Sequence, residues 1–102
     1  MVTIIFRTKM QAGKEEKALE ALRAMAETVQ AQEPATLSYL FHRSQQDPSE
    51  IVLFEIYADE AALQAHGQTP HMGELRAAFA GLFDTSSVKI ERLERVGGFA
   101  RA

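Results

Sequence analysis

The sequence predicts an α+β protein with the ferredoxin-like order β-α-β-β-α-β, in which helices cover one face of a four-stranded antiparallel sheet. Two kinds of pattern support this prediction. Four segments alternate their side chains with a period of two, as strands do, and the segments between them carry apolar residues at helical spacing. Prolines and short polar runs separate these segments, so each can form a distinct element.

The first half of the chain predicts a strand, a long helix and a second strand. Residues 2–8 place Val2, Ile4 and Phe6 on one face of a strand. Residues 14–32 contain no proline or glycine, and their apolar residues recur at helical spacing, which predicts a helix with one buried face. Pro34 ends that helix, and residues 36–43 alternate again as a second strand.

The second half begins with a polar hairpin loop at residues 44–50. A third strand at residues 51–58 is apolar on both faces, so we expect both faces to be covered. Asp59 is placed to cap a short helix that reaches about His66, and Thr69-Pro70 starts another helix. The apolar stripe of the helix that starts at Pro70 comprises Met72, Leu75, Phe79 and Leu82. Residues 88–96 predict the last strand.

Length and composition limit the possible classes of protein. The 102 residues suit a single domain spanning residues 1–102, with residues 97–102 as a tail. The net charge of −3, with acids and bases interspersed, predicts neither nucleic-acid nor membrane binding. The chain has no cysteine, which excludes thiolate nucleophiles and cysteine-bound metal centres. The start of the sequence shows no leader segment, so we expect a cytoplasmic protein.

The sheet face away from the helices also needs a cover. Ile4 or Ile5, together with Leu53 and Tyr57, is expected to form an apolar patch there that is too large for a soluble monomer. A second copy of the chain is the simplest cover. Two sheets packed face to face would form a closed or nearly closed β-barrel, which predicts a symmetric homodimer through the sheet face.

The chain carries a series of short motifs in a fixed order: Glu33-Pro34, Tyr39, Asp47-Pro48, Glu55, Tyr57, Asp59, His66, Thr69 and His71. This series resembles the antibiotic biosynthesis monooxygenase (ABM) family of the dimeric α+β barrel superfamily. The resemblance covers nearly the whole chain, and Ala35 is a departure at a turn where the family often has glycine.

The resemblance implies a small homodimeric enzyme that oxygenates an aromatic or quinol-like molecule with dioxygen and without a bound cofactor. The family also contains a haem-degrading branch that relies on an asparagine, a tryptophan and a histidine. This chain has no asparagine and no tryptophan, so that branch is a poor match. A further branch isomerises a phosphorylated signalling sugar derivative, and many members have no assigned activity.

His66 is the leading candidate for a catalytic base, because an imidazole can accept a phenolic proton near neutral pH and return it later. Glu55 is the second catalytic candidate, since a carboxylate in an apolar strand needs a partner. It can orient a histidine, bind substrate hydroxyls, or pair with one of three arginines. Those arginines are Arg7, Arg43 and Arg92.

Three more residues are predicted to bind substrate: Tyr39, Tyr57 and His71. Each has a structural alternative, because tyrosines often pack in the core with a polar tip and His71 can fix a turn. His66 can likewise cap the end of its helix. No metal is predicted, because His66 and His71 lack the i, i+4 spacing that places two ligands on one helical face.

Two other functions remain open at this point. One is a proton-shuttling isomerase of a phosphorylated sugar derivative, which needs a basic pocket supplied by Arg7, Arg43 or Arg76. The other is a non-catalytic, dimeric small-molecule-binding or stress-response domain. The identity of the substrate does not follow from the sequence, because several elements shape a pocket.

Overall fold

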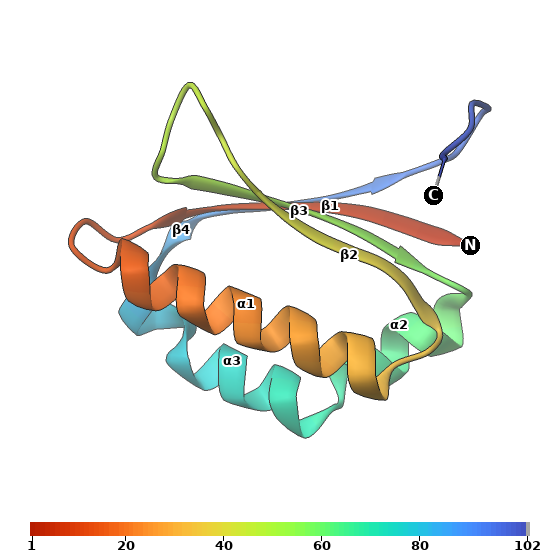
Figure 1. Cartoon of the computed structure of the whole chain (residues 1–102), viewed down its shortest axis with the longest axis horizontal. Coiled ribbons are helices and arrows are strands. Elements are labelled where there is room, and N and C mark those ends of the chain that lie inside the picture. Colours follow the sequence, from red (N-terminus) through yellow and green to blue (C-terminus); the bar gives the residue numbers. More distant parts are fainter. Residues whose placement is uncertain (102) are drawn as a thin grey trace.

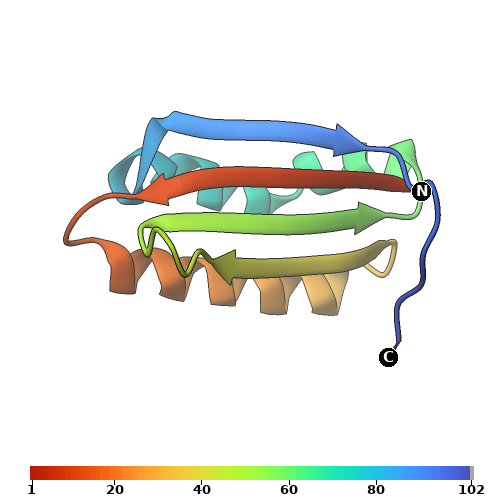
Figure 2. The ribbon, with the colours of Figure 1, turned by 90° about the horizontal axis from the view of Figure 1, so that it is seen from above.

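A single antiparallel sheet with strand order β2-β3-β1-β4 carries three helices on one face (Figures 1 and 2). The computed structural model describes residues 1–101, so residue 102, the last of the predicted tail, lies outside the described residues. The strands are β1 (Val2–Met10), β2 (Thr36–Arg43), β3 (Glu50–Tyr57) and β4 (Phe83–Leu93), and the helices are α1 (Glu15–Gln32), α2 (Glu60–Gly67) and α3 (Pro70–Leu82).

This arrangement confirms the predicted ferredoxin-like fold, with α2 and α3 together in the place of the second helix. Strand β1 lies between β3 and β4 and pairs with both of them in the antiparallel sense. The hairpin of β2 and β3 completes the sheet on the β3 side. Strands that lie far apart in the sequence therefore meet at the centre of the sheet.

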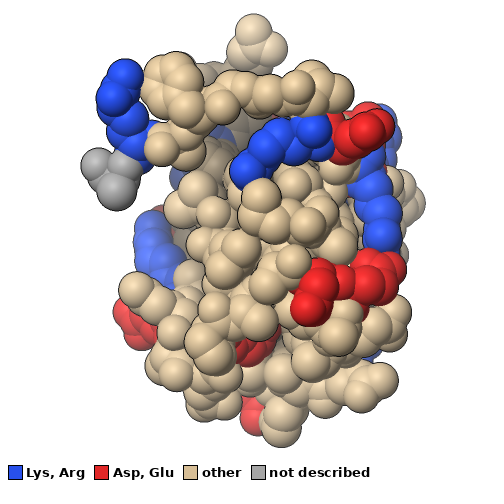
Figure 3. Space-filling view, turned by 90° about the vertical axis from the view of Figure 1, so that its right-hand side faces the viewer, with Lys and Arg blue, Asp and Glu red and all other residues tan. Residues whose placement is uncertain are grey.

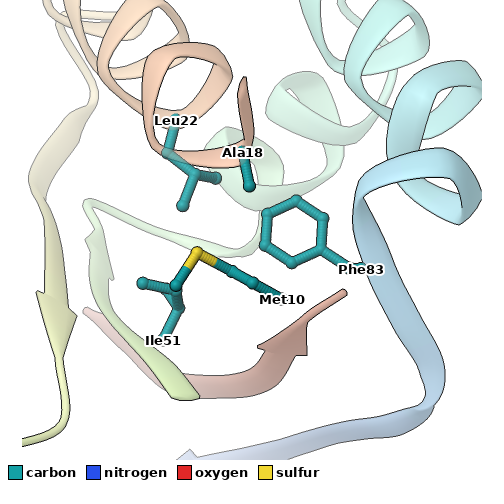
Figure 4. Close-up of a cluster of buried hydrophobic side chains, with 5 residues drawn as sticks. All are labelled: Met10, Ala18, Leu22, Ile51 and Phe83. Carbon is teal, nitrogen blue, oxygen red and sulfur yellow. The ribbon is translucent and has the colours of Figure 1, made fainter. Parts of the chain in front are cut away.

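Helix α1 packs on the sheet through one apolar stripe, as its spacing predicts. The four residues of this stripe, Ala18, Leu22, Met25 and Val29, are buried. At one end of the sheet Ala18 and Leu22 meet Met10, Ile51 and Phe83 in the tightest part of the core (Figure 4). This cluster joins α1 to three strands and leaves the space under α3 less filled.

Strand β4 begins at Phe83, five residues earlier than the predicted start, and ends at Leu93. The polar segment after Phe83 has the composition of a loop, yet it stays in the sheet through a bulge opposite Arg7 and Lys9. The Lys9 amide donates to Ser87 Oγ at 2.8 Å, and the Ser87 hydroxyl donates to the carbonyl of Asp84 at 2.6 Å. The Ser87 side-chain oxygen thus takes the place of a backbone carbonyl as the acceptor for the Lys9 amide. The alternation of side chains along the strand does not reveal this substitution.

The predicted assignment of residues to the open sheet face is wrong for Leu53 and Tyr57, and of the two alternatives Ile4 and Ile5 it holds for Ile5. Ile4, Leu53 and Tyr57 are buried on the helix side of the sheet. The alternation of a strand fixes which residues share a face, but not which face meets the helices. The open face instead carries apolar side chains from three strands. They are Ile5, Leu40, Val52, Phe54 and Ile56.

Charged side chains do not form a patch of one sign on the end of the molecule shown in Figure 3, where cationic and anionic groups are interspersed. Within residues 1–101, no helix is long and apolar enough to cross a membrane. The cytoplasmic location stays a prediction. The last described residues, 97–101, contain no helix or strand.

The N-cap residue Asp59 stabilises the start of α2, and this role can be tested by mutation. Asp59 Oδ1 accepts a hydrogen bond from the Ala62 amide at 2.8 Å. We expect Asp59→Ala to lower the free energy of unfolding by about 1 kcal/mol, because the first turn of α2 loses its acceptor. Asp59→Asn keeps an acceptor and should stay close to the wild type. Urea unfolding measures the stability of both variants. A free energy of unfolding that is unchanged in Asp59→Ala would contradict this role of the cap.

Candidate active site

A cavity of about 410 Å³ lies between the helices and the sheet. This volume falls within the range of small-molecule sites, about 300–1,000 Å³. Its walls are mainly apolar, and its few polar groups come from different elements. The lining residues that the site uses are Phe6, Leu53, Glu55, Tyr39, His66, Leu75, Arg76 and Phe79.

The cavity opens between α3 and β4. Of its lining residues, only Arg76, Ala80 and Thr85 are exposed, and all three belong to these two elements. No residue of α3 is fully buried, although its apolar stripe faces inward as predicted. Helix α3 therefore roofs a hollow rather than a filled core.

Capping fixes His66 at the junction of α2 and α3. His66 lies in the last turn of α2, and Thr69 is the N-cap of α3. The Thr69 hydroxyl donates to the His66 carbonyl at 2.8 Å and accepts from the Met72 amide at 3.3 Å. One threonine thus ties the end of α2 to the start of α3, and it holds the backbone of the histidine.

The carboxylate of Glu33 binds both histidines of the site. Its Oε1 lies 2.8 Å from His66 Nδ1 and 2.9 Å from Thr36 Oγ1, and its Oε2 accepts a hydrogen bond from His71 Nε2. The Glu33 side chain is only 10% exposed. Four segments, from the ends of α1 and α2 and the starts of β2 and α3, therefore converge on one buried carboxylate. We call Glu33, His66 and His71 the carboxylate cluster.

Electrostatics favour an ionised Glu33. Burial alone would raise its pKa, but the hydrogen bonds from His71, His66 and Thr36 outweigh burial and hold the pKa of Glu33 below its usual value. An ionised carboxylate can only accept hydrogen bonds, so His66 must donate through Nδ1–H. In the neutral ring, Nε2 is then the acceptor.

The free nitrogen of His66 is open to the cavity. Within residues 1–101, no side-chain nitrogen or oxygen is sealed off without a hydrogen-bond partner. His66 Nε2 has no such partner, so it must reach the accessible space that His66 lines. The rings of Tyr39 and Tyr57 pack against the imidazole, with centroids 5.4 and 5.3 Å away. The ring is therefore held on both its bonded edge and its sides.

Glu55 also presents an oxygen to the cavity. Its Oε1 accepts a hydrogen bond from the Tyr57 hydroxyl, while its Oε2 has no partner and is not sealed off. Burial raises the pKa of Glu55, and this outweighs the lowering effects of Tyr57 and His66. The carboxyl group is thus closer to holding a proton than an exposed glutamate is.

Tyr39 supplies a third polar atom. Burial, together with the negative charges of Glu55 and Glu33, raises the pKa of Tyr39, so its phenol keeps its proton. Its hydroxyl has no protein partner within residues 1–101 and is not sealed off, and Tyr39 lines the cavity. The site therefore combines an acceptor nitrogen, a carboxyl oxygen and a phenol donor above apolar walls.

The structure brings three of the five predicted site residues to the cavity: His66, Glu55 and Tyr39. Tyr57 is fully buried behind Glu55, because its hydroxyl is bound to that carboxyl. His71 turns away to Glu33 and lines a separate groove between α1 and α3. Neither residue forms part of the cavity wall.

Two structural alternatives from the sequence are also wrong. Glu55 pairs with Tyr57 rather than with an arginine, since Arg7 and Arg92 bind Glu50 and Glu60, respectively. Arg43 donates to a loop carbonyl. The side chain of His66 does not cap α2, because it is bound to Glu33.

The role of Glu33 was not predicted from the sequence, where this residue stands out only as part of a Glu-Pro motif. A signal was present. Glu33 is the C-cap of α1, where the helix dipole disfavours a negative charge. A glutamate at such a position needs a partner from elsewhere in the fold, but the sequence does not show that two histidines supply it.

The carboxylate cluster is not arranged as a metal site. Each histidine directs an N–H at a Glu33 oxygen, so the three groups bind one another instead of converging on a common point. Among residues 1–101, no group of three or more histidine, aspartate or glutamate side chains is placed to hold a metal ion.

Comparisons with known proteins agree with this architecture. The family model described as antibiotic biosynthesis monooxygenase matches residues 1–78. PA3566 from Pseudomonas aeruginosa is 27% identical, with a TM-score of 0.84 and 94% of each chain covered. Rv0793 from Mycobacterium tuberculosis is 27% identical, with a TM-score of 0.85, covering 97% of this chain and 98% of that one.

A candidate antibiotic biosynthesis monooxygenase from Caulobacter crescentus is also 27% identical, with a TM-score of 0.87, covering 94% of this chain and 90% of its own. No curated protein sequence matches the chain. The fold and the cavity define a small α+β domain of the ferredoxin-like class with a buried polar site. The chain belongs to the antibiotic biosynthesis monooxygenase family.

Glu33→Gln tests the carboxylate cluster. At pH 7 we expect the free energy of unfolding to fall by about 2 kcal/mol, because two bonds to a buried charged acceptor are weakened. The folded pKa of Glu33 lies below its unfolded value of about 4.3, so its stabilisation is complete above that value and is lost as the pH falls through the folded pKa.

Between pH 7 and about pH 2, the difference between wild type and Glu33→Gln should therefore persist above about pH 5 and shrink below about pH 4. Denaturant unfolding across this range measures it. Glu27→Gln, an exposed position on the same helix, is the matched control and should show little change at any pH. A Glu33→Gln effect that stayed undiminished down to about pH 2 would contradict the assignment.

Proposed function

We propose that the protein is a cofactor-independent monooxygenase of an aromatic or quinol-like small molecule. The observation that supports this most is the free Nε2 of His66, which opens into an apolar cavity while Glu33 holds Nδ1. A histidine base in a cavity with apolar walls suits a substrate that is a flat, weakly acidic hydroxyarene. Membership of the antibiotic biosynthesis monooxygenase family supports the same reaction class.

In the proposed first step, His66 Nε2 removes a proton from the substrate, for example from the acidic CH₂ of an anthrone or its phenolic tautomer. The electron pair stays on the ring system as a delocalised anion. Tyr39 donates a hydrogen bond to the oxygen on which this charge collects. Glu33 stays ionised opposite Nδ1–H and stabilises the imidazolium that results.

In the second step, the anion passes one electron to dioxygen, and the resulting radical pair forms a carbon–oxygen bond. The hydroperoxide loses water, which leaves one oxygen atom in a new carbonyl group and the other in the water. For an anthrone the balance is CH₂ plus O₂ giving C=O plus H₂O. Dioxygen is the only oxidant, and the protons released by the substrate leave in the water.

We assign to Glu55 the task of assisting the loss of water. Its raised pKa favours a carboxyl group that can give a proton to the departing oxygen, and its Oε2 faces the cavity. Tyr57 acts behind it as a positioning residue, because its hydroxyl fixes the other carboxyl oxygen. The dry, apolar walls shield the anion from water until dioxygen reacts.

The two other functions receive less support. An isomerase of a phosphorylated sugar needs a basic, polar pocket, but Arg7 and Arg43 form their contacts away from the cavity. Arg76 alone of the three touches it, and the remaining wall is mainly apolar. A non-catalytic binding domain predicts that removal of the His66 imidazole leaves function unchanged.

Oxygen uptake by the metal-free protein with a panel of quinols and anthrones tests the proposal. We expect His66→Ala to lower kcat about 10²- to 10⁴-fold, the usual contribution of a general base. His42→Ala is the matched control, because His42 is exposed on the opposite sheet face. Circular dichroism and thermal unfolding check that both variants fold.

Uptake that depends on His66 but not on His42 supports the oxygenase. Uptake that survives in a folded His66→Ala variant would show that another group removes the proton. No uptake with any member of the panel would count against an aromatic oxygenase and direct attention to ligand binding.

We also propose that the protein is a homodimer through the open sheet face. Ile5, Phe54 and Leu40 lie side by side across three strands there, and Leu40 is 54% exposed. An apolar strip of this kind is unfavourable in water. A second copy would cover it with an identical strip, as two-fold symmetry requires.

Two leucines of β2 make a matched test of the dimer. Leu40 is on the open face, whereas Leu37, which is 52% exposed, lies at the bulge of β2 between Thr36 and Ser38, outside the strip that Leu40 forms with Phe54 and Ile5. We expect Leu40→Glu to halve the mass measured by light scattering after size exclusion, because the charge cannot be buried between the sheets. Leu37→Glu should leave the mass unchanged. A monomeric wild type, or equal effects of the two variants, would contradict this interface.

A further inference from the structure

Arg76 is a charged residue of the cavity wall to which the proposed mechanism gives no role. It lies in α3 at the opening between α3 and β4 and is exposed. Its Nη2 donates to the carbonyl of Gly67 at 3.0 Å. Since Gly67 directly follows His66, this bond anchors the guanidinium at the α2–α3 junction, next to the residue that carries the base.

Within residues 1–101, Arg76 has no carboxylate partner that would explain its charge. On its own helix, the residues three and four positions away are Met72, Gly73, Phe79 and Ala80, and none is acidic. The arginines of residues 1–101 that pair with carboxylates are Arg7 and Arg92. A guanidinium has five N–H donors, and Arg76 uses one donor group on a carbonyl, so a planar fork remains available.

The chemistry of the opening differs from that of the interior. The interior walls are apolar and end at the polar atoms of His66, Glu55 and Tyr39, whereas the opening carries a fixed positive charge. A ligand that fits both regions has a flat apolar body and one anionic group at its outer end. Arginine binds carboxylates and other oxyanions in a two-pronged manner, which gives direction as well as attraction.

We infer that Arg76 forms an anion-recognition point at the cavity opening, and that the preferred substrate is an aromatic compound bearing one carboxylate or similar oxyanion. This inference rests on the proposed function for the identity of the cavity as a substrate site. The anionic group anchors the outer end of the molecule, and the reacting ring lies inside against His66. Arg76 thus selects the substrate and sets its orientation, while the chemistry stays with the buried groups.

Equilibrium binding of two matched probes tests the inference without relying on turnover. The probes are 2-naphthoate, which is ionised at pH 7, and neutral 2-naphthamide, which has the same ring system. Isothermal titration with the 102-residue chain should show 2-naphthoate binding about 10-fold or more tightly than the amide, as expected for a charge-assisted pair. Arg76→Gln should abolish this preference and leave 2-naphthamide affinity unchanged.

Arg23→Gln, an exposed arginine of α1 outside the cavity, is the control for net charge and should keep the preference. Equal affinities in the wild type, no binding of either probe, or a preference that persists in Arg76→Gln would overturn the inference. The preference without oxygen uptake by any quinol would support the anion site and reject the oxygenase. Oxygen uptake without a preference for 2-naphthoate would support the oxygenase and reject the anion site.

Discussion

The site depends on one interaction: a single buried carboxylate accepts hydrogen bonds from two histidines. Glu33 stands at the end of α1, His66 at the end of α2 and His71 at the start of α3, so this carboxylate sets the relative position of all three helices. A buried charge is tolerated only with such partners. The same bonds that keep Glu33 ionised also fix which nitrogen of His66 is free.

One part of the interior is tightly packed, and another part contains the cavity. At one end of the sheet, Met10, Ile51 and Phe83 fill the space under α1 with apolar side chains (Figure 4). Under α3 the interior is left hollow, and the helix that covers it has no fully buried residue. An unfilled cavity costs packing energy. A protein that keeps one, with three polar atoms directed into it, retains a site at the expense of stability.

Much of the fold follows from the sequence because local patterns are strong. The helical stripe of α1, the caps at Asp59 and Thr69, and the two-residue alternation of the strands each fix an element. Long-range relations were harder to predict. The face on which Leu53 lies and the bulge that keeps Ser87 in the sheet depend on other strands. Likewise, His66 and Glu55 could be chosen from residue type, but the link from Glu33 to His71 spans 38 residues and left no local pattern.

The most direct test of this account is the tautomer of His66, read from ¹H–¹⁵N correlations of the imidazole at a pH where the ring is neutral. We expect a proton on Nδ1 and an unprotonated Nε2 in the wild type, with this preference weakened in Glu33→Gln. A proton on Nε2 in the wild type would contradict it, because His66 would then present a donor to the cavity and could not act as the base.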